Sequence, residues 1–185
     1  MALEEPAIIV VSGIQGAGKS TVARSLAERF SRGVHVEADA LQRMIVSGGE
    51  WVGEAGEPTG EAARQLRLRL HNACLLARSF FEAGFTAVVD DIIIGERFDD
   101  LRADLAGLPF RLVVLAPDAA VVIARDEERE HTVGEEWARY LDEEQRKTMA
   151  GSGLWVDSSG QTAAETVDEV MSRLEDEGLV ESEAS

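Results

Sequence analysis

The sequence predicts a three-layer α/β/α fold, in which helices cover both faces of a parallel sheet. Short apolar segments alternate with segments of helical periodicity along the chain, and this order is typical of parallel strands joined by right-handed crossovers. The first apolar segment, residues 7–12, is continuously apolar up to Ser12, as expected for a strand buried on both faces. The chain has 185 residues, 45% of them hydrophobic, which fits one domain with a single core.

Apolar segments interpreted as strands alternate with periodic segments interpreted as helices. The strands are expected at residues 7–12, 34–37, 85–89, 110–115 and 154–156. The helices are expected at residues 19–30, 40–46, 61–83, 98–105, 119–129, 136–150 and 163–176. No linker or internal repeat divides these elements, so we expect one domain over residues 1–178 and an acidic tail at residues 179–185.

The ends of two helices are predicted from local sequence. Gly84 follows the longest helix, and glycine in this position commonly ends a helix in the left-handed conformation. Thr162 stands immediately before the last helix, and Glu165 follows it three residues later. This is the spacing of a capping box. By contrast, several glycines and Pro58 exclude a regular element from residues 47–60, so we expect a loop or mobile flap there, which extends over about residues 44–60.

Residues 13–20 match the phosphate-binding pattern G-x-x-x-x-G-K-[ST], the Walker A motif or P-loop, at every fixed position. Its glycines let backbone N–H groups converge on phosphate oxygens, and the following helix presents its positive end. Lys19 is expected to contact the β- and γ-phosphates and to assist catalysis, and Ser20 is expected to bind Mg²⁺. The predicted nucleotide contacts are Gly13, Gln15, Gly16, Ala17, Gly18, Lys19, Ser20 and Thr21. The motif therefore predicts a P-loop NTPase fold.

Two acids end the apolar segment 85–89 and are expected at the carboxyl edge of the sheet, where parallel folds bind ligands. We assign Asp90 to the Mg²⁺ site, because carboxylates hold this ion directly or through its waters. Asp91 is expected beside it, facing either the metal or the substrate. The alternative is that these acids only cap a turn at the strand end.

Asp39 follows the second predicted strand and should reach the same edge of the sheet. A carboxylate there can accept the proton of an attacking hydroxyl, as a general base in phosphoryl transfer. Glu37 is a lesser candidate, and the pattern leaves open whether Asp39 or Asp91 is the base. The alternative for Asp39 is the N-cap of the helix at residues 40–46.

An arginine-bearing lid is predicted at about residues 125–151. Arg125 and Arg129 are four residues apart and share one helix face, from which they can stabilise the negative charge that develops during phosphoryl transfer. A lid of this kind would also exclude water from the reaction. Alternatively, the arginines pair with neighbouring acids on a solvated helix. Those acids are Glu127, Glu128, Glu130, Glu135 and Glu136.

Composition excludes several classes of function. The net charge of −17 and the pI near 4.5 oppose binding to nucleic-acid phosphate or to an anionic membrane. No apolar segment approaches the roughly 20 residues that span a bilayer. Cys74 is the only cysteine, which excludes an intramolecular disulfide. We therefore expect a cytoplasmic protein without nucleic-acid or membrane partners; the oligomeric state is not predicted.

The residues above resemble those of P-loop kinases of the nucleotide-kinase-like group, and the chain is most similar to the chloramphenicol phosphotransferase-like proteins. The matching residues are the P-loop, Asp39, the pair Asp90–Asp91, the arginines 125 and 129, and residues 155–159. This resemblance implies a five-stranded parallel sheet with the P-loop strand at its centre, Asp39 as the base, and the lid arginines as transition-state clamps. It also implies ATP with Mg²⁺, and an acceptor pocket formed by residues 47–60 with Trp51. That segment does not match the antibiotic kinase, so chloramphenicol is not carried over as the acceptor.

The sequence thus predicts an ATP-dependent phosphotransferase that moves the γ-phosphoryl group to a hydroxyl of a small molecule. The alternatives are a nucleotide or nucleotide-sugar kinase, and a non-catalytic ATP-binding regulatory protein. A GTP-binding switch is disfavoured, because the guanine-reading pattern Asn-Lys-x-Asp is missing: Asn72 is the only asparagine, and alanine follows it.

Overall fold

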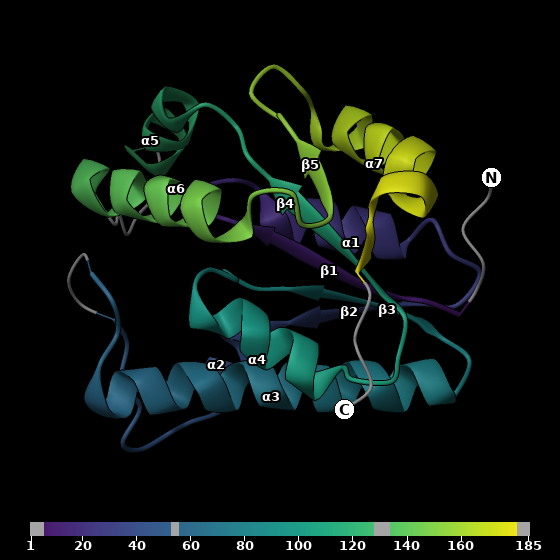
Figure 1. The fold of residues 1–185 in the computed structure, drawn as a ribbon, viewed down its shortest axis with the longest axis horizontal. Helices are drawn as coiled ribbons and strands as arrows, with labels where there is room; N and C mark the ends of the chain where they lie inside the picture. The colour runs from purple at the N-terminus through teal and green to yellow at the C-terminus, as the bar shows by residue number, and fades with distance from the viewer. Residues whose placement is uncertain (1–5, 53–55, 128–133, 181–185) are drawn as a thin grey trace.

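The computed structural model describes residues 6–52, 56–127 and 134–180 of the chain. Within these residues, one sheet is formed by β1 (Ile8–Gly13), β2 (Gly33–Glu37), β3 (Thr86–Asp90), β4 (Phe110–Leu115), β5 (Leu154–Val156) and β6 (Leu179–Val180). The helices are α1 (Lys19–Ala27), α2 (Ala38–Arg43), α3 (Gly60–Glu82), α4 (Glu96–Asp104), α5 (Ala119–Glu127), α6 (Glu135–Met149) and α7 (Ala163–Glu177). The predicted alternation of strands and helices is confirmed (Figure 1).

The strand order is β2-β3-β1-β4-β5, with every neighbouring pair on this path parallel. The expected five-stranded parallel sheet is therefore present, with β1, the strand before the P-loop, in the middle. The chain moves outward from β1 in both directions, toward β2 on one side and β5 on the other. Such a reversal opens a crevice at the carboxyl ends of the strands, where ligands bind in open α/β sheets.

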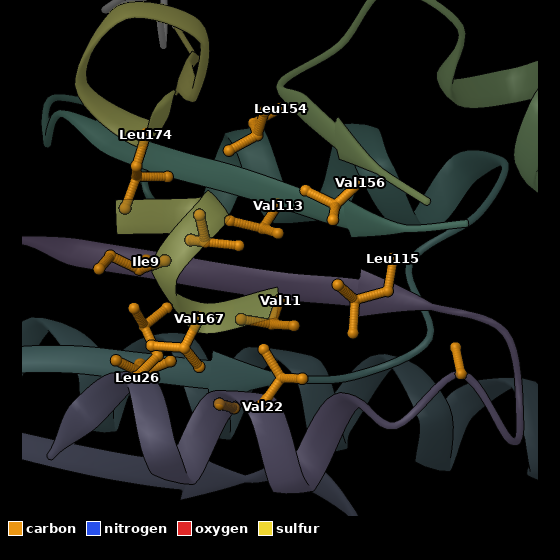
Figure 2. Packing of buried hydrophobic residues seen from close by; sticks show 14 of the residues in the cluster. Ile9, Val11, Val22, Leu26, Val113, Leu115, Leu154, Val156, Val167 and Leu174 are labelled. Atoms are coloured by element: carbon orange, nitrogen blue, oxygen red, sulfur yellow. The ribbon is translucent and has the colours of Figure 1, made fainter. Parts of the chain in front are cut away.

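Helices cover both faces of the sheet, as the three-layer prediction requires. Successive residues of β1 point to opposite faces, so Ile9 and Val11 join one buried cluster while Ile8 and Val10 join the other. In the first cluster the strands pack against α1 and α7, and Figure 2 shows Leu26 and Val167 among these contacts. In the second, the strands pack against α3 and α4. Burial on both faces explains why the sequence of β1 is continuously apolar.

One prediction about the sheet and the tail is wrong. Residues 179–180 were assigned to an acidic tail, but they form β6, which pairs antiparallel with β4 through Phe110 and Arg111. Val180 is buried and joins the second core cluster, whereas Leu179 remains half exposed. The gain from burying one valine against the end of β4 explains why a short strand forms here.

Both predicted helix ends are confirmed. Gly84 has a φ of 81°, in the left-handed region, immediately after the last turn of α3. Thr162 is the N-cap of α7 and forms a reciprocal capping box with Glu165. Among the helices of the described residues, none is both long and apolar enough to cross a bilayer.

Candidate functional site

The P-loop connects the buried strand β1 to the first turn of α1. Gly16 and Gly18 have φ values of 84° and 90°, which side chains other than glycine rarely adopt. At Gly13 the constraint is space, because a Cβ atom would lie 2.8 Å from the carbonyl oxygen of Leu115 on β4. No side chain caps the start of α1, so its first backbone N–H groups are available to an anion.

Lys19 lies across this loop. Its Nζ atom donates a hydrogen bond to the carbonyl oxygen of Ile14, at 3.0 Å. Burial lowers the pKa of Lys19, and the negative charges of Asp90, Asp39 and Asp91 oppose this effect. The ammonium group therefore lies inside the loop and close to three carboxylates that favour its charged form.

Asp90 ends β3 beside the P-loop. The hydroxyl of Ser20 donates a hydrogen bond to its Oδ2 atom at 2.6 Å, and the Nε2 atom of His35 lies 2.8 Å from its Oδ1 atom. Asp90 is almost fully buried, and His35 on β2 is mostly buried. One hydroxyl and one carboxylate fit Mg²⁺, which binds through oxygen ligands and keeps several of its waters.

Arg69 of α3 joins Asp39 to Asp91. Its Nη1 atom donates to Oδ1 of Asp39 at 2.9 Å, and its Nη2 atom donates to Oδ1 of Asp91. Arg97 of α4 donates to Oδ2 of Asp91 at 2.5 Å, and the backbone N–H of Ile92 donates to Oδ1 at 2.8 Å. Both oxygens of Asp91 thus accept hydrogen bonds, from two arginines and one backbone N–H.

Asp39 differs from Asp91 in exposure. The side chain of Asp39 is 50% exposed, against 1% for Asp91. Asp39 is the second residue of α2, and the N-cap position is occupied by Glu37, so the alternative role of Asp39 as the N-cap is excluded. Its carboxylate is instead presented at the carboxyl edge of the sheet.

Two adjoining cavities lie at this edge. The smaller has a volume of about 110 Å³ and lies over the P-loop. It is lined by Gln15, Gly16, Gly18, Lys19, Ser20, Thr21, Asp39, Asp90, Asp91 and Ile92. The larger has a volume of about 660 Å³ and shares Gln15, Asp39 and Ile92 with the smaller one. The structure therefore brings Lys19, Ser20, Asp39 and Asp90 together around one space.

The flap and α6 both contribute to the lining of the larger cavity. The described flap residues that line it are Trp51, Val52, Gly56, Glu57 and Pro58. From α6 come Trp137, Tyr140, Leu141 and Glu144. In Figure 1, α6 and the start of α3 lie at the same end of the molecule, with the carboxyl ends of the central strands.

The lid arginines are described only in part. Arg125 lies within α5, but its side chain is outside the described residues, as is the whole of Arg129. Further along, Arg139 and Arg146 of α6 pair with acids four residues earlier, and both arginines are more than half exposed. Arg139 and Arg146 therefore form solvated ion pairs on the surface of α6.

Three residues of the site were not selected from the sequence: Arg69, Arg97 and His35. Arg69 could have been recognised from the sequence. It lies four residues after Gln65 on the apolar face of α3, and a charged residue on a buried face needs a buried partner of opposite charge. His35 carries no comparable signal, because Asp90 is 55 residues away and the pairing of β2 with β3 brings the two together. Arg97 carries none either, because its contact with Asp91, six residues earlier, depends on how α4 follows the end of β3.

Comparison with known proteins decides the family. A family model described as an AAA domain matches residues 8–153. The chain belongs to this family. The match to the AAA domain runs from the start of β1 to the residue before β5 and includes the P-loop, Asp39 and Asp90. No curated protein matches the chain.

Solved structures with a fold similar to this AAA domain include three bacterial proteins. One is a sugar kinase from Janibacter sp. HTCC2649, with a TM-score of 0.64, 19% identity, and coverage of 90% of this chain and 92% of that one. Another is a gluconokinase from Sinorhizobium meliloti 1021, with a TM-score of 0.62, 23% identity, and 92% coverage of both chains. The third is the tunicamycin resistance protein of Deinococcus radiodurans, with a TM-score of 0.66, 20% identity, and coverage of 95% and 98%. The AAA domain described here therefore has the P-loop kinase fold.

Proposed function

We propose that this protein is a small-molecule kinase that transfers the γ-phosphoryl group of ATP to a hydroxyl group. The observation that carries the proposal is the placement of Asp39 between two adjoining cavities, one over the P-loop and one large enough for an acceptor. The similar structures named a sugar kinase and a gluconokinase support the same class of reaction.

The smaller cavity is assigned to the phosphates of ATP. Backbone N–H groups of residues 13–21 and the ammonium of Lys19 would bind the phosphate oxygens. Ser20 and Asp90 would hold Mg²⁺, which neutralises negative charge on the β- and γ-phosphates when bound. Gln15 lines both cavities and would lie beside the γ-phosphate.

The larger cavity is assigned to the acceptor alcohol. Its hydroxyl oxygen would form a bond to the γ-phosphorus as the bond to the β–γ bridging oxygen breaks, which releases ADP. The hydroxyl proton would pass to Asp39, which is half exposed, rather than to Asp91, whose two oxygens already accept hydrogen bonds. Arg125 and Arg129 are proposed to stabilise the negative charge that develops on the transferred group.

The partners proposed are ATP and a small-molecule acceptor. A net charge of −17 opposes nucleic acid and anionic membranes as partners. A single cysteine, buried in the core, suits the reducing cytoplasm, which we propose as the location of the protein.

Two measurements together test this function. Isothermal titration with ATP and Mg²⁺ is expected to show binding without an acceptor. An ADP-release assay across sugars, nucleosides, nucleoside monophosphates, amino alcohols and phenols is expected to show acceptor-dependent turnover. Binding of ATP without turnover on any acceptor would favour the non-catalytic regulator. Turnover confined to nucleoside monophosphates would favour the nucleotide kinase.

A further inference from the structure

The residues that line the larger cavity, called the acceptor pocket from here on, indicate the charge of the ligand that it binds. This inference rests on the proposed function for the position of the reacting hydroxyl. An alcohol in the acceptor pocket reaches Asp39, because that residue lines both this pocket and the cavity over the P-loop. The rest of the lining then determines what else the acceptor must carry.

The three arginines that line the described part of the acceptor pocket are committed to carboxylates. Arg67 donates to both oxygens of Asp104, at 2.6 and 3.0 Å. Arg69 and Arg97 both donate to Asp91, whose side chain is 1% exposed. If Arg69 or Arg97 moved toward an anionic acceptor, the buried carboxylate of Asp91 would lose part of the positive charge that balances it. Such an unbalanced buried charge is strongly destabilising. The pocket therefore binds a phosphate or carboxylate group unfavourably.

Acids outnumber arginines in the lining. The lining acids are Asp39, Glu57, Glu96, Asp100 and Glu144. Glu57 and Glu96 form no ion pair with another described residue, and Glu144 pairs at 3.0 Å with Lys147, whose side chain is 73% exposed and outside the pocket lining. The Glu144 side chain is 27% exposed, but the ammonium of Lys147 is largely solvated, so the pair contributes little and is readily exchanged. Since the three arginines are already balanced by carboxylates, the remaining acids give the pocket a net negative charge.

An aromatic wall adds a second, independent feature. The rings of Trp137 and Tyr140 on α6 stack with centroids 5.6 Å apart and an interplanar angle of 28°. Trp51 enters the same pocket from the flap. Burial raises the pKa of Tyr140, and the charges of Glu144 and Glu57 raise it further, so both carboxylates lie near the phenol. Aromatic faces attract cations, most strongly where nearby acids add to the field.

We propose that the acceptor is a cationic alcohol, a hydroxyl compound that carries an ammonium or guanidinium group on an apolar body. Its charged group lies against the wall of Trp137 and Tyr140, between Glu57 and Glu144, while its hydroxyl faces Asp39. Carboxylated and phosphorylated alcohols are rejected. The hydroxyl oxygen takes the γ-phosphoryl group, ADP leaves, and the hydroxyl proton passes to Asp39.

A matched series of small alcohols tests this charge preference. Phenylethanolamine, 1-phenyl-1,2-ethanediol and mandelate share a phenyl ring and a benzylic hydroxyl but carry an ammonium, a neutral and a carboxylate group. Their binding is measured by quenching of tryptophan fluorescence, both without nucleotide and with ATP and Mg²⁺. We expect the amine to bind at least about tenfold more tightly than the diol, a difference typical of one desolvated cation–π contact, and mandelate to bind most weakly.

Variants of the acids then locate the cation. The double substitution Glu57→Gln with Glu144→Gln is expected to weaken amine binding by about tenfold and to leave diol binding unchanged. Glu143→Gln, an exposed acid of α6 outside the pocket lining, is the matched control and should change neither.

Equal binding of mandelate and the amine, equal losses for amine and diol in the double variant, or no binding by any of the three compounds would each overturn the inference. Each of these outcomes is distinct from failure of the proposed function, which is read from ATP binding and ADP release.

Discussion

Arg69 holds Asp39 by a hydrogen bond of 2.9 Å and is itself anchored by the buried carboxylate of Asp91. The guanidinium therefore connects the half-exposed acid of α2 to the end of β3. Two separate nitrogens of the planar guanidinium contact the two carboxylates, a span that the single compact ammonium of lysine does not reproduce.

The first prediction concerns Arg69→Lys. Because a single ammonium keeps the charge but loses the bridge, kcat should fall by about tenfold or more, while the KM for ATP stays unchanged. Steady-state kinetics measures both. Arg64→Lys on the same helix is the control, since within the described part of the chain Arg64 pairs with Glu61 at the surface and with no residue of the site. Full kcat in Arg69→Lys would contradict a positioning role.

Asp90→Asn should raise the Mg²⁺ concentration needed for half-maximal activity by about ten- to a hundredfold, because the neutral amide is a poorer partner for the cation. Activity is titrated with Mg²⁺ at saturating ATP. Asp99→Asn, at an exposed position of α4, should leave the requirement as it is. An unchanged requirement in Asp90→Asn would remove Asp90 from the metal site.

Acid stability should depend on Asp104. Burial raises the pKa of Asp104, but hydrogen bonds from Arg67 and His71 lower it more, so the net pKa lies below the ordinary value of 3.8. A depressed pKa in the folded state means that the group stabilises the protein above its unfolded pKa and loses this contribution as the pH falls through the folded value. Asp104→Asn should therefore be less stable than the wild type near neutral pH, and the difference should shrink in acid.

Urea unfolding at about pH 6, 4 and 3 measures this difference. Asp176→Asn, an exposed acid near the end of α7, serves as the control and should follow the wild type throughout. A gap between Asp104→Asn and the wild type that stays constant down to the lowest pH would show that the titration of Asp104 is not its source.

Asp39→Asn should retain ATP binding and lose phosphoryl transfer, with kcat reduced by about 10²–10⁴-fold, because asparagine cannot accept the proton of the hydroxyl. ADP release with the best acceptor of the screen measures the loss. Asp176→Asn is again the control, because it makes the same substitution at a residue that lines neither cavity. Turnover at the wild-type rate would disprove the assignment of Asp39 as the base.

The order of strands and helices was predictable because buried parallel strands carry an unbroken apolar signal. The segments 110–115 and 154–156 agree with β4 and β5 at both ends. β6 was missed because a strand of two residues has no periodicity, and because it forms only where Val180 pairs with Phe110 of β4 and joins the core. Local sequence therefore predicts the long elements and fails on the shortest.

The candidate site was predictable where its residues form a contiguous motif or end a strand. The P-loop residues, Asp39 and Asp90 were found in this way. The bridge from Arg69 to Asp91 was not, because it joins α3 to the end of β3 across 22 residues and depends on how the helix packs. The charge of the acceptor pocket was also hidden, since its lining comes from the flap, α3, α4 and α6 together.

The most direct test of the account is the affinity of the P-loop for ATP with Mg²⁺, measured by isothermal titration in the wild type, Lys19→Ala and Asp39→Asn. We predict binding in the wild type, binding of similar affinity in Asp39→Asn, and a loss of at least about tenfold in Lys19→Ala, where a charged phosphate contact is removed. Equal affinity in Lys19→Ala and the wild type, or no binding in the wild type, would contradict the claim that this loop holds the phosphates of a nucleotide.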